Sequence, residues 1–289
     1  MKRCLHCDRC FDRPDWHCPA CGFRPPLIDG LPALAPELAL GGAGFHPEAF
    51  ADLARLEAAN FWFRARNRLI VWALRRYFPD MARFLEIGCG TGYVLSGITD
   101  AFPQAHLVGS EVFSAGLSFA ARRLPKAELL QMDARSIPYD SEFDVIGAFD
   151  VLEHIEEDEA VLVEMHRAIA QHGGIILTVP LHPWLWSRQD EYACHVRRYC
   201  VGELSEKVRR AGFRLLFQTT FVSLLLPAMV VSRLANLHAL AKADPLAELK
   251  LPGLINRVFL AVMQAEFGLI RAGIRFPVGG SLLLVATKT

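Results

Sequence analysis

Short apolar runs alternate with amphipathic stretches through the middle and the end of the chain. Several of the runs have the length and apolar content of buried strands, at 84–87, 106–109, 128–131, 144–149, 174–179, 214–219 and 282–287. Between them, helical patterns fill 93–101, 115–124, 158–169 and 201–211. Short apolar strands separated by helices predict an α/β fold with a mainly parallel sheet covered on both faces.

Two further helical patterns flank this alternation. Residues 47–78 carry apolar side chains at helical spacing, and Pro79 ends the pattern. Residues 222–278 separate the last two strands as a helical insertion, where Arg257, Gln264 and Arg271 form a polar stripe on an otherwise apolar helix. The predicted division is a module at 1–28, a linker and helix start at 29–59, a core at 60–221, the insertion at 222–278 and the last strand at 279–289.

The composition bounds the class of protein. With 289 residues, 52% of them hydrophobic, the chain can form one large core and a small module. Lys+Arg and Asp+Glu both number 31, so the balanced charge gives no general attraction to nucleic acid. The first residues lack the apolar run of a secretory signal, and polar residues interrupt the apolar region at 215–231. We therefore expect a cytoplasmic protein, with contact to a membrane surface left open.

Five of the eight cysteines fall in the first 21 residues. Cys4 and Cys7 form one C-x-x-C pair, and Cys18 and Cys21 form a second pair that resembles the second knuckle of a zinc-ribbon. Four thiolates match the tetrahedral geometry of a structural Zn²⁺ site. Cys10 offers an alternative pairing with Cys7, and an iron–sulfur cluster is the lesser alternative.

A glycine-rich turn follows the strand predicted at 84–87. Gly88, Gly90 and Gly92 allow a sharp turn and close approach to a ligand, and the turn runs into a helix. The dinucleotide fingerprint G-x-G-x-x-G would need a glycine where Tyr93 stands. The observed G-x-G-x-G after Glu86 resembles motif I of the class I S-adenosylmethionine-dependent methyltransferases. This resemblance implies that the acid, the three glycines and Cys89 bind that cofactor.

Later segments resemble the same family in the same order. Glu111 follows the second strand, where the family acid accepts hydrogen bonds from the ribose, although a solvated acid is the simpler alternative. Asp133, followed by Ala134, resembles the acid that binds the adenine amino group. Asp150 opens a D-x-L-E-H motif that lines the methionine end, and Arg66 could meet the methionine carboxylate.

The resemblance covers roughly residues 60–221 and the last strand. It implies a seven-stranded, mainly parallel methyltransferase sheet with a reversed final strand, an N-terminal zinc-ribbon and a helical insertion before the last strand. If the side chains of Glu111 and Asp133 pointed away from the Gly88–Gly92 turn, the assignment would fail.

Two histidines are candidates for a general base. His154 follows the fourth strand, and His195 lies in the segment after the fifth strand, where this family builds its acceptor pocket. Each has a structural alternative, a capping or core histidine for His154 and a surface loop for His195. The nearby Arg197 and Arg198 could bind an anionic or polar acceptor.

These observations predict an S-adenosylmethionine-dependent methyltransferase that acts on a small, lipophilic or lipid-linked metabolite. The alternatives are an RNA methyltransferase, for rRNA or tRNA, that uses the zinc-ribbon to bind its substrate, and a non-catalytic cofactor-binding adaptor. The apolar insertion 222–278 is interpreted as a cap over the acceptor pocket, with a dimer interface, a peripheral membrane contact and ordinary core packing as alternatives. The identity of the acceptor and the oligomeric state lie beyond the sequence.

Overall fold

The centre of the molecule is a seven-stranded sheet in the order β10-β11-β9-β8-β5-β6-β7. We describe it in a computed structural model that covers residues 1–41, 46, 49–237 and 250–289. The strands are β5 (Arg83–Ile87), β6 (His106–Glu111), β7 (Glu128–Gln131), β8 (Phe143–Phe149), β9 (Ile169–Pro180), β10 (Phe213–Phe221) and β11 (Ser281–Lys288). The pairs among β5, β6, β7, β8 and β9 are parallel, whereas β11 lies antiparallel between β9 and β10. The predicted fold class, with its reversed final strand, is confirmed.

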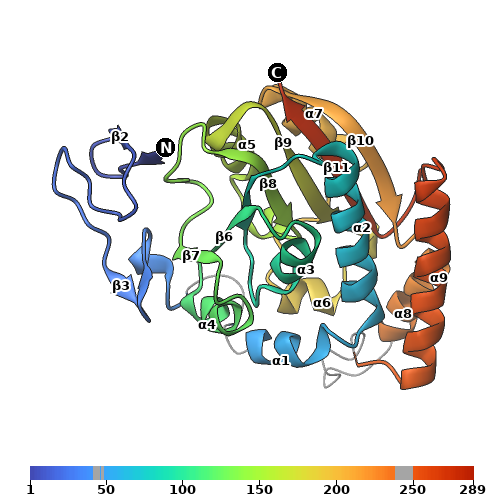
Figure 1. The fold of residues 1–289 in the computed structure, drawn as a ribbon. Coiled ribbons are helices and arrows are strands. Elements are labelled where there is room, and N and C mark those ends of the chain that lie inside the picture. Colours follow the sequence, from blue (N-terminus) through green and yellow to red (C-terminus); the bar gives the residue numbers. More distant parts are fainter. Residues whose placement is uncertain (42–45, 47–48, 238–249) are drawn as a thin grey trace.

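Helices cover both faces of the sheet (Figure 1). The main ones after the first strand of the sheet are α3 (Tyr93–Ala101), α4 (Ser114–Arg123), α5 (Asp158–Ala168) and α7 (Glu203–Arg210). One apolar layer joins the sheet to α5 and α7, through Leu162 and Leu204, and the other joins it to α2 (Phe61–Tyr77) and α3, through Ile70 and Leu95. These opposed layers explain why the strands are apolar on both sides.

The helical pattern at 47–78 is two helices in the structure rather than one. Helix α1 (Ala49–Leu56) ends before α2, and the side chain of Asn60 accepts a hydrogen bond of 2.8 Å from the backbone N–H of Trp62. An asparagine cap begins a new helix because it satisfies an N–H group that has no partner within that helix. The predicted strand at 174–179 is also longer, since β9 begins at Ile169 and shifts register before Gly174.

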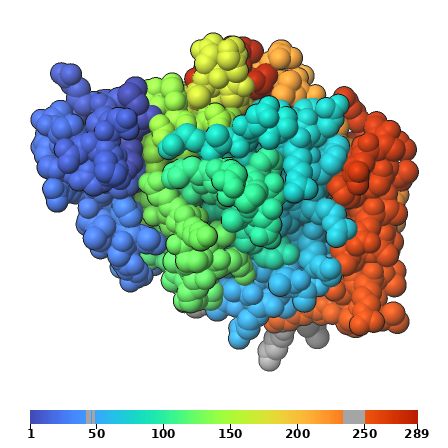
Figure 2. Space-filling view, viewed as in Figure 1, coloured from blue at the N-terminus to red at the C-terminus, as the bar shows by residue number. Residues whose placement is uncertain are grey.

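The N-terminal region lies beside the β7 edge of the sheet (Figures 1 and 2). It contains the short strands β1 (Lys2–Arg3), β2 (Cys10–Phe11), β3 (Leu27–Ile28) and β4 (Leu31–Pro32), and the 3-10 turn η1 (Pro36–Leu38). Ala33 bridges Gln131 of β7, whose side-chain amide also exchanges hydrogen bonds of 3.0 and 2.7 Å with the backbone of Ala35. The domain boundaries stay a prediction, but part of the segment predicted as a linker is bound to the core.

The insertion before the last strand contains α8 (Leu226–Leu237) and α9 (Gly253–Arg271), which lie at the opposite end of the molecule from the N-terminal region (Figure 1). Residues 238–249 of the predicted insertion lie outside the described residues. Helix α9 packs on α2, and Glu266 accepts backbone hydrogen bonds of 2.7 Å from both Ser223 and Leu224. By length and composition alone, α9 is apolar enough to cross a membrane, although such a feature is weak support for doing so.

Candidate active site

A cavity of about 970 Å³ opens at the carboxyl ends of the central strands. The glycine-rich turn after β5, Glu111 at the end of β6, Asp133 after β7 and Asp150 after β8 all line it. Parallel strands place their carboxyl ends at one edge of a sheet, which is where open α/β folds bind ligands. The structure therefore brings the predicted cofactor residues together around one space.

The glycine-rich turn depends on conformations that favour glycine. Gly88, Gly90 and Gly92 have φ values of 66°, 51° and 75°, in the left-handed region. A Cβ at Gly88 would also lie 2.5 Å from a methyl carbon of Val151. Glu111 accepts a hydrogen bond of 3.0 Å from the backbone N–H of Gly90, so its carboxylate faces the turn.

Two further backbone groups bind the Glu111 carboxylate. Val112 and Phe113 donate N–H bonds of 2.8 and 3.2 Å to its Oε1 atom. Burial raises the pKa of Glu111, and these three N–H donors oppose that shift by stabilising the charged form. The same carboxylate thus fixes the turn and offers its outer lone pairs to the cavity.

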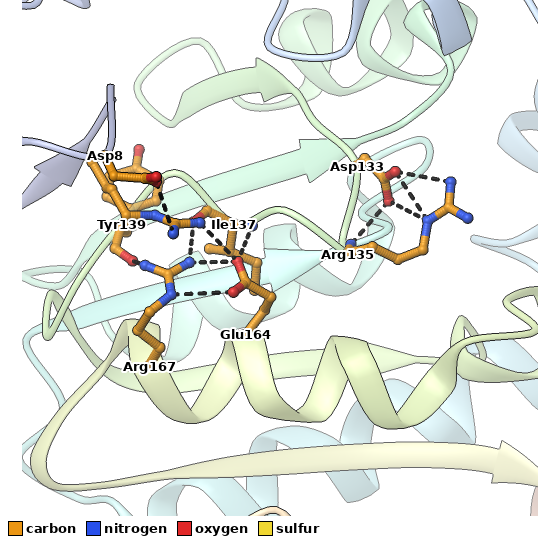
Figure 3. A network of polar contacts seen from close by, with 8 residues as sticks. Asp8, Asp133, Arg135, Ile137, Tyr139, Glu164 and Arg167 are labelled. Atoms are coloured by element: carbon orange, nitrogen blue, oxygen red, sulfur yellow. Dashed lines mark hydrogen bonds and ion pairs between the residues drawn. The ribbon is translucent and has the colours of Figure 1, made fainter. Parts of the chain in front are cut away.

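Asp133 and Ala134 lie on the cavity wall next to Glu111. Arg135 holds the Asp133 carboxylate, with its Nε atom 3.1 and 3.0 Å from the two oxygens and its backbone N–H 2.9 Å from one of them (Figure 3). Arg135 also pairs with Glu157 at 3.1 Å. Arg135 therefore fixes the orientation of the Asp133 carboxylate. Glu111 faces the glycine-rich turn, whereas the contact of Asp133 with the cofactor stays a prediction.

Arg66 of α2 reaches the cavity and forms an ion pair with Asp150. Its guanidinium also lies over the ring of Trp62, 4.4 Å from the centroid. Glu86 is buried nearby, and its Oε2 atom has no hydrogen-bond partner among the residues that the structure describes. Burial raises the pKa of Glu86, while the charge of Arg66 lowers it. The predicted contact of Arg66 with the cofactor's carboxylate stays a prediction.

The far part of the cavity contains both candidate bases. The rings of His154 and His195 meet edge to face, with their centroids 4.6 Å apart. Two backbone contacts bring these distant segments together, since Val196 donates a 2.8 Å bond to the carbonyl of Glu153 and Leu181 forms a bridge with Tyr199. The structure places the two histidines side by side in one cavity, which the sequence did not predict, and their chemical roles stay predictions.

The two histidines differ in their surroundings. Burial and the neighbouring His195 lower the pKa of His154 to about 3, so His154 stays neutral. His195 shares a hydrogen bond of 2.8 Å between its Nδ1 atom and the buried carboxylate of Asp190. Burial alone would raise the pKa of Asp190, but the bond with His195 and the charge of Arg198 lower it to about 2. An ionised Asp190 holds the ring of His195 in one orientation.

Comparison with known proteins finds a methyltransferase domain within the chain. Residues 85–177 match the family model described as a methyltransferase domain. This match, together with the methyltransferase relatives described below, supports a class I S-adenosylmethionine-dependent methyltransferase. The match spans the glycine-rich turn, Glu111, Asp133, Asp150 and His154, which are the residues that converge on the cavity.

Individual relatives align with parts of this methyltransferase chain. A trans-aconitate 2-methyltransferase of Variovorax paradoxus is 31% identical over 35% of this chain and 40% of its own length. A protein named as a probable S-adenosylmethionine-dependent methyltransferase of Mycolicibacterium smegmatis is 25% identical over 55% of this chain and 61% of its own. A solved structure of a [4+2]-cyclase has the same fold, with a TM-score of 0.53 and 21% identity, over 78% of this chain and 83% of that one. The chain thus spans about half the length of the two curated relatives. The cyclase shows that the fold alone does not determine the reaction.

Several residues of the methyltransferase site were missed by sequence reasoning. Glu57, directly after α1, is buried, accepts a 2.7 Å bond from Thr91 and pairs with Arg123, which ties the end of α1 to the glycine-rich turn. Asp190 and Glu153 were missed as well. Both could have been considered from their positions, because Asp190 precedes His195 by five residues and Glu153 is the acid of the D-x-L-E-H motif.

The insertion contributes one wall of the same cavity. Met229 and Arg233 of α8 line it, and Arg233 donates a hydrogen bond to the hydroxyl of Ser187. Ser187 in turn caps the short helix α6 (Arg188–Tyr192), which carries Asp190. The insertion thus lines the cavity, while its role as a cap over an acceptor, as a dimer interface or as a membrane contact stays a prediction.

The predicted metal cysteines converge in the N-terminal region. The Sγ atoms of Cys4, Cys7, Cys18 and Cys21 all lie within 4.8 Å of one another. Cys10 is exposed on β2 and does not belong to this group. The cluster therefore favours the pairing of two C-x-x-C units over the alternative that uses Cys10.

Each cysteine pair is followed by the same turn. The carbonyl of Cys4 accepts a 2.9 Å bond from Asp8, and that of Cys18 accepts a 3.0 Å bond from Gly22. Asp8 and Gly22 both have positive φ, at 58° and 75°. Hydrogen bonds from the backbone N–H groups of Cys21 and Ala20 to the Cys18 sulfur lower the pKa of Cys18 to about 6. Two equivalent turns that direct sulfur atoms to one point fit a tetrahedral metal.

The cysteine module is attached to the loop that carries Asp133. The backbone N–H of Arg3 donates a 2.8 Å bond to Pro138, and its guanidinium lies 3.2 Å from Glu164. Trp16 contacts Tyr139 edge to face, with the ring centroids 5.4 Å apart. In Figure 3, Glu164 lies in a polar network with Arg167, Ile137 and Tyr139, apart from the Asp133–Arg135 pair.

Proposed function

We propose that this protein transfers a methyl group from S-adenosylmethionine to a small-molecule acceptor. The observation that carries the proposal is one continuous cavity, with the glycine-rich turn and Glu111 at one part and Glu153, His154 and His195 at another. The relative named as a trans-aconitate 2-methyltransferase supports a small metabolite as the acceptor. Apolar lining by Phe61, Trp62 and Met229 suits a lipophilic acceptor.

The residues present fit the cofactor. Gly88, Gly90 and Gly92 line the cavity with backbone and no side chain, and Glu111 and Asp133 line the same cavity with carboxylates. Burial of Glu86 with an unpartnered oxygen leaves an acceptor beside the turn. When bound, S-adenosylmethionine supplies an activated methyl group on a positive sulfur.

The protein's own residues then position the reactants. Arg66, fixed by Asp150, lines the cavity, and the histidine side offers polar groups to the acceptor. Holding two reactants in line can contribute about 7–11 kcal/mol to lowering a barrier. Residues of α1, α2 and α8 line that space. Exclusion of water by such walls would favour the transfer.

Calorimetric titration with S-adenosylhomocysteine tests the cofactor site, and mass spectrometry of candidate acceptors tests transfer. We expect binding and a gain of one methyl group on a small acceptor. Absence of S-adenosylhomocysteine binding would refute the proposal, whereas binding without transfer to any small molecule would favour the adaptor alternative.

We further propose that Cys4, Cys7, Cys18 and Cys21 hold a structural Zn²⁺, since four thiolates leave no open position. The module has only a small buried cluster, so metal binding would supply much of its folding free energy. Elemental analysis should find one zinc per chain in the wild type and in Cys10→Ser, and close to none in Cys18→Ser. Equal zinc loss in both variants would contradict this ligand set.

A further inference from the structure

Glu153 is a buried carboxylate without hydrogen bonds. Its side chain has no exposed surface, and neither oxygen accepts a hydrogen bond from any described residue. Burying a charged group without a partner is costly, so such groups usually pair with another group or bind an ion. Glu153 lines the cavity, where a ligand could provide that partner.

Two histidines face the same point. Glu153, His154 and His195 each offer one ligand atom, and these three atoms lie within 4.8 Å of one another. Two imidazoles and one carboxylate form a common ligand set for divalent transition metals, and three protein ligands leave coordination positions open.

Both histidines also have a partner outside this group. His195 uses Nδ1 for Asp190, which is itself held by Arg198 at 2.8 Å. His154 hydrogen-bonds to the backbone carbonyl of Ala193. Metal-binding histidines almost always engage their second ring nitrogen in this way, because it fixes the ring and its tautomer.

The nearby arginines pair with other acids and not with the carboxylate of Glu153. Arg66 is paired with Asp150, and Arg198 is paired with Asp190. Among the described residues, no lysine or arginine forms an ion pair with Glu153. A divalent cation would therefore neutralise a carboxylate that the protein itself leaves unpaired.

We propose that Glu153, His154 and His195 bind one divalent transition-metal cation in the acceptor part of the cavity. Its catalytic role rests on the proposed function, and it specifies the acceptor as an alcohol, phenol or enol oxygen that occupies an open coordination position. Coordination lowers the pKa of that hydroxyl, and its proton leaves to water. The oxygen lone pair then forms the bond to the methyl carbon, while the carbon–sulfur electron pair moves to sulfur and leaves a neutral thioether.

Binding of Mn²⁺ tests the site without any acceptor. Mn²⁺ prefers nitrogen and oxygen ligands, so the cysteine cluster is left loaded with zinc during the titration of the full chain. Loss of the free Mn²⁺ signal in electron paramagnetic resonance should report one bound ion per chain. We expect Glu153→Gln and His195→Gln each to weaken Mn²⁺ binding by at least about tenfold. Glu159→Gln, the same change at an exposed residue, should bind as the wild type does.

The outcomes separate this site from the proposed function. No Mn²⁺ binding by the wild type, or equal binding by the wild type and both variants, would overturn the metal site. Glu153→Gln removes a buried charge, so we expect it to fold and to be at least as stable as the metal-free wild type. The same samples are titrated with S-adenosylhomocysteine. Mn²⁺ binding without S-adenosylhomocysteine binding would refute the proposed function and support the metal site. S-adenosylhomocysteine binding without Mn²⁺ binding would refute the metal site and leave the proposed function supported.

Discussion

The two parts of the cavity are built in different ways. Around the glycine-rich turn, Glu86, Glu111, Asp133 and Asp150 each lie at or just after the end of a different central strand. The acceptor part instead combines the motif after β8, the segment around α6 and helix α8 of the insertion. The first arrangement follows directly from the order of the strands, whereas the second depends on contacts between segments far apart in sequence.

This difference predicts that a few buried polar contacts contribute more to the stability of the acceptor part than to that of the cofactor part. Asp190 accepts bonds from His195 and Arg198 on one oxygen, and from the backbone and hydroxyl of Ser187 on the other. Asp190→Asn leaves the buried guanidinium of Arg198 without its anion, so we expect a loss of about 3–5 kcal/mol in the free energy of unfolding. Urea denaturation at pH 7 measures this loss.

The pH dependence of that loss follows from the lowered pKa of Asp190. The pKa of this carboxyl falls from 3.8 to about 2 on folding. Its ionised form therefore stabilises the folded protein fully at pH values above 3.8. Its contribution is lost as the pH drops from about 3.8 to about 2, so the two proteins should converge there. Asp100→Asn, at an exposed residue of α3, should change stability by no more than about 0.5 kcal/mol. A change below about 1 kcal/mol for Asp190→Asn at pH 7 would show that Arg198 finds another partner.

In the cofactor part, the largest effect should come from Glu111→Ala. This change removes the acceptor for Gly90 together with two predicted charge-assisted bonds to the ribose, each worth about 1.5 kcal/mol or more. We expect the affinity for S-adenosylhomocysteine to fall by about 100-fold, measured by calorimetry. His195→Gln lies in the other part and should leave this affinity within about threefold of the wild type. Equal losses in both variants would mean that the two parts are one coupled unit.

This contrast also explains what the sequence could predict. The strands and the cofactor residues were predictable because a strand's end and the residue after it are local features, and the glycine-rich turn marks the first of them. The role of Glu57 was not predictable from the sequence, because its contacts with Thr91 and Arg123 form only once the segment after α1 lies against the turn. The proximity of His154 and His195 was also beyond sequence, since it depends on the contact of Val196 with Glu153.

A smaller effect is expected for Asp133, which is predicted to accept one hydrogen bond from the adenine amino group. Asp133→Ala should lower the affinity for S-adenosylhomocysteine by about tenfold, as expected for about 1.4 kcal/mol. An analogue whose purine lacks the 6-amino group should bind the wild type and the variant alike. If the variant weakened the binding of both ligands equally, Asp133 would act by holding Arg135 and the loop, rather than by contacting the base.

The smallest effect on stability is predicted at the outer face of α9, far from the cysteine module. Val258 is 52% exposed, whereas its neighbour Phe259 packs edge to face on Phe61 of α2 with centroids 5.2 Å apart. Val258→Glu should therefore change the free energy of unfolding by no more than about 0.5 kcal/mol, because it removes no buried contact.

The same variant tests whether the insertion contacts a membrane. An exposed apolar face formed by Leu254, Val258 and Leu269 would bury itself at a lipid surface, so a new charge there should reduce cosedimentation with phospholipid vesicles several-fold. Gln264→Glu adds the same charge on the polar stripe of α9 and should leave vesicle binding unchanged. Equal vesicle binding by the wild type and Val258→Glu, or none by either, would limit the insertion to its role as a wall of the cavity. The apolar face would then be an exposed surface that the acceptor site does not require.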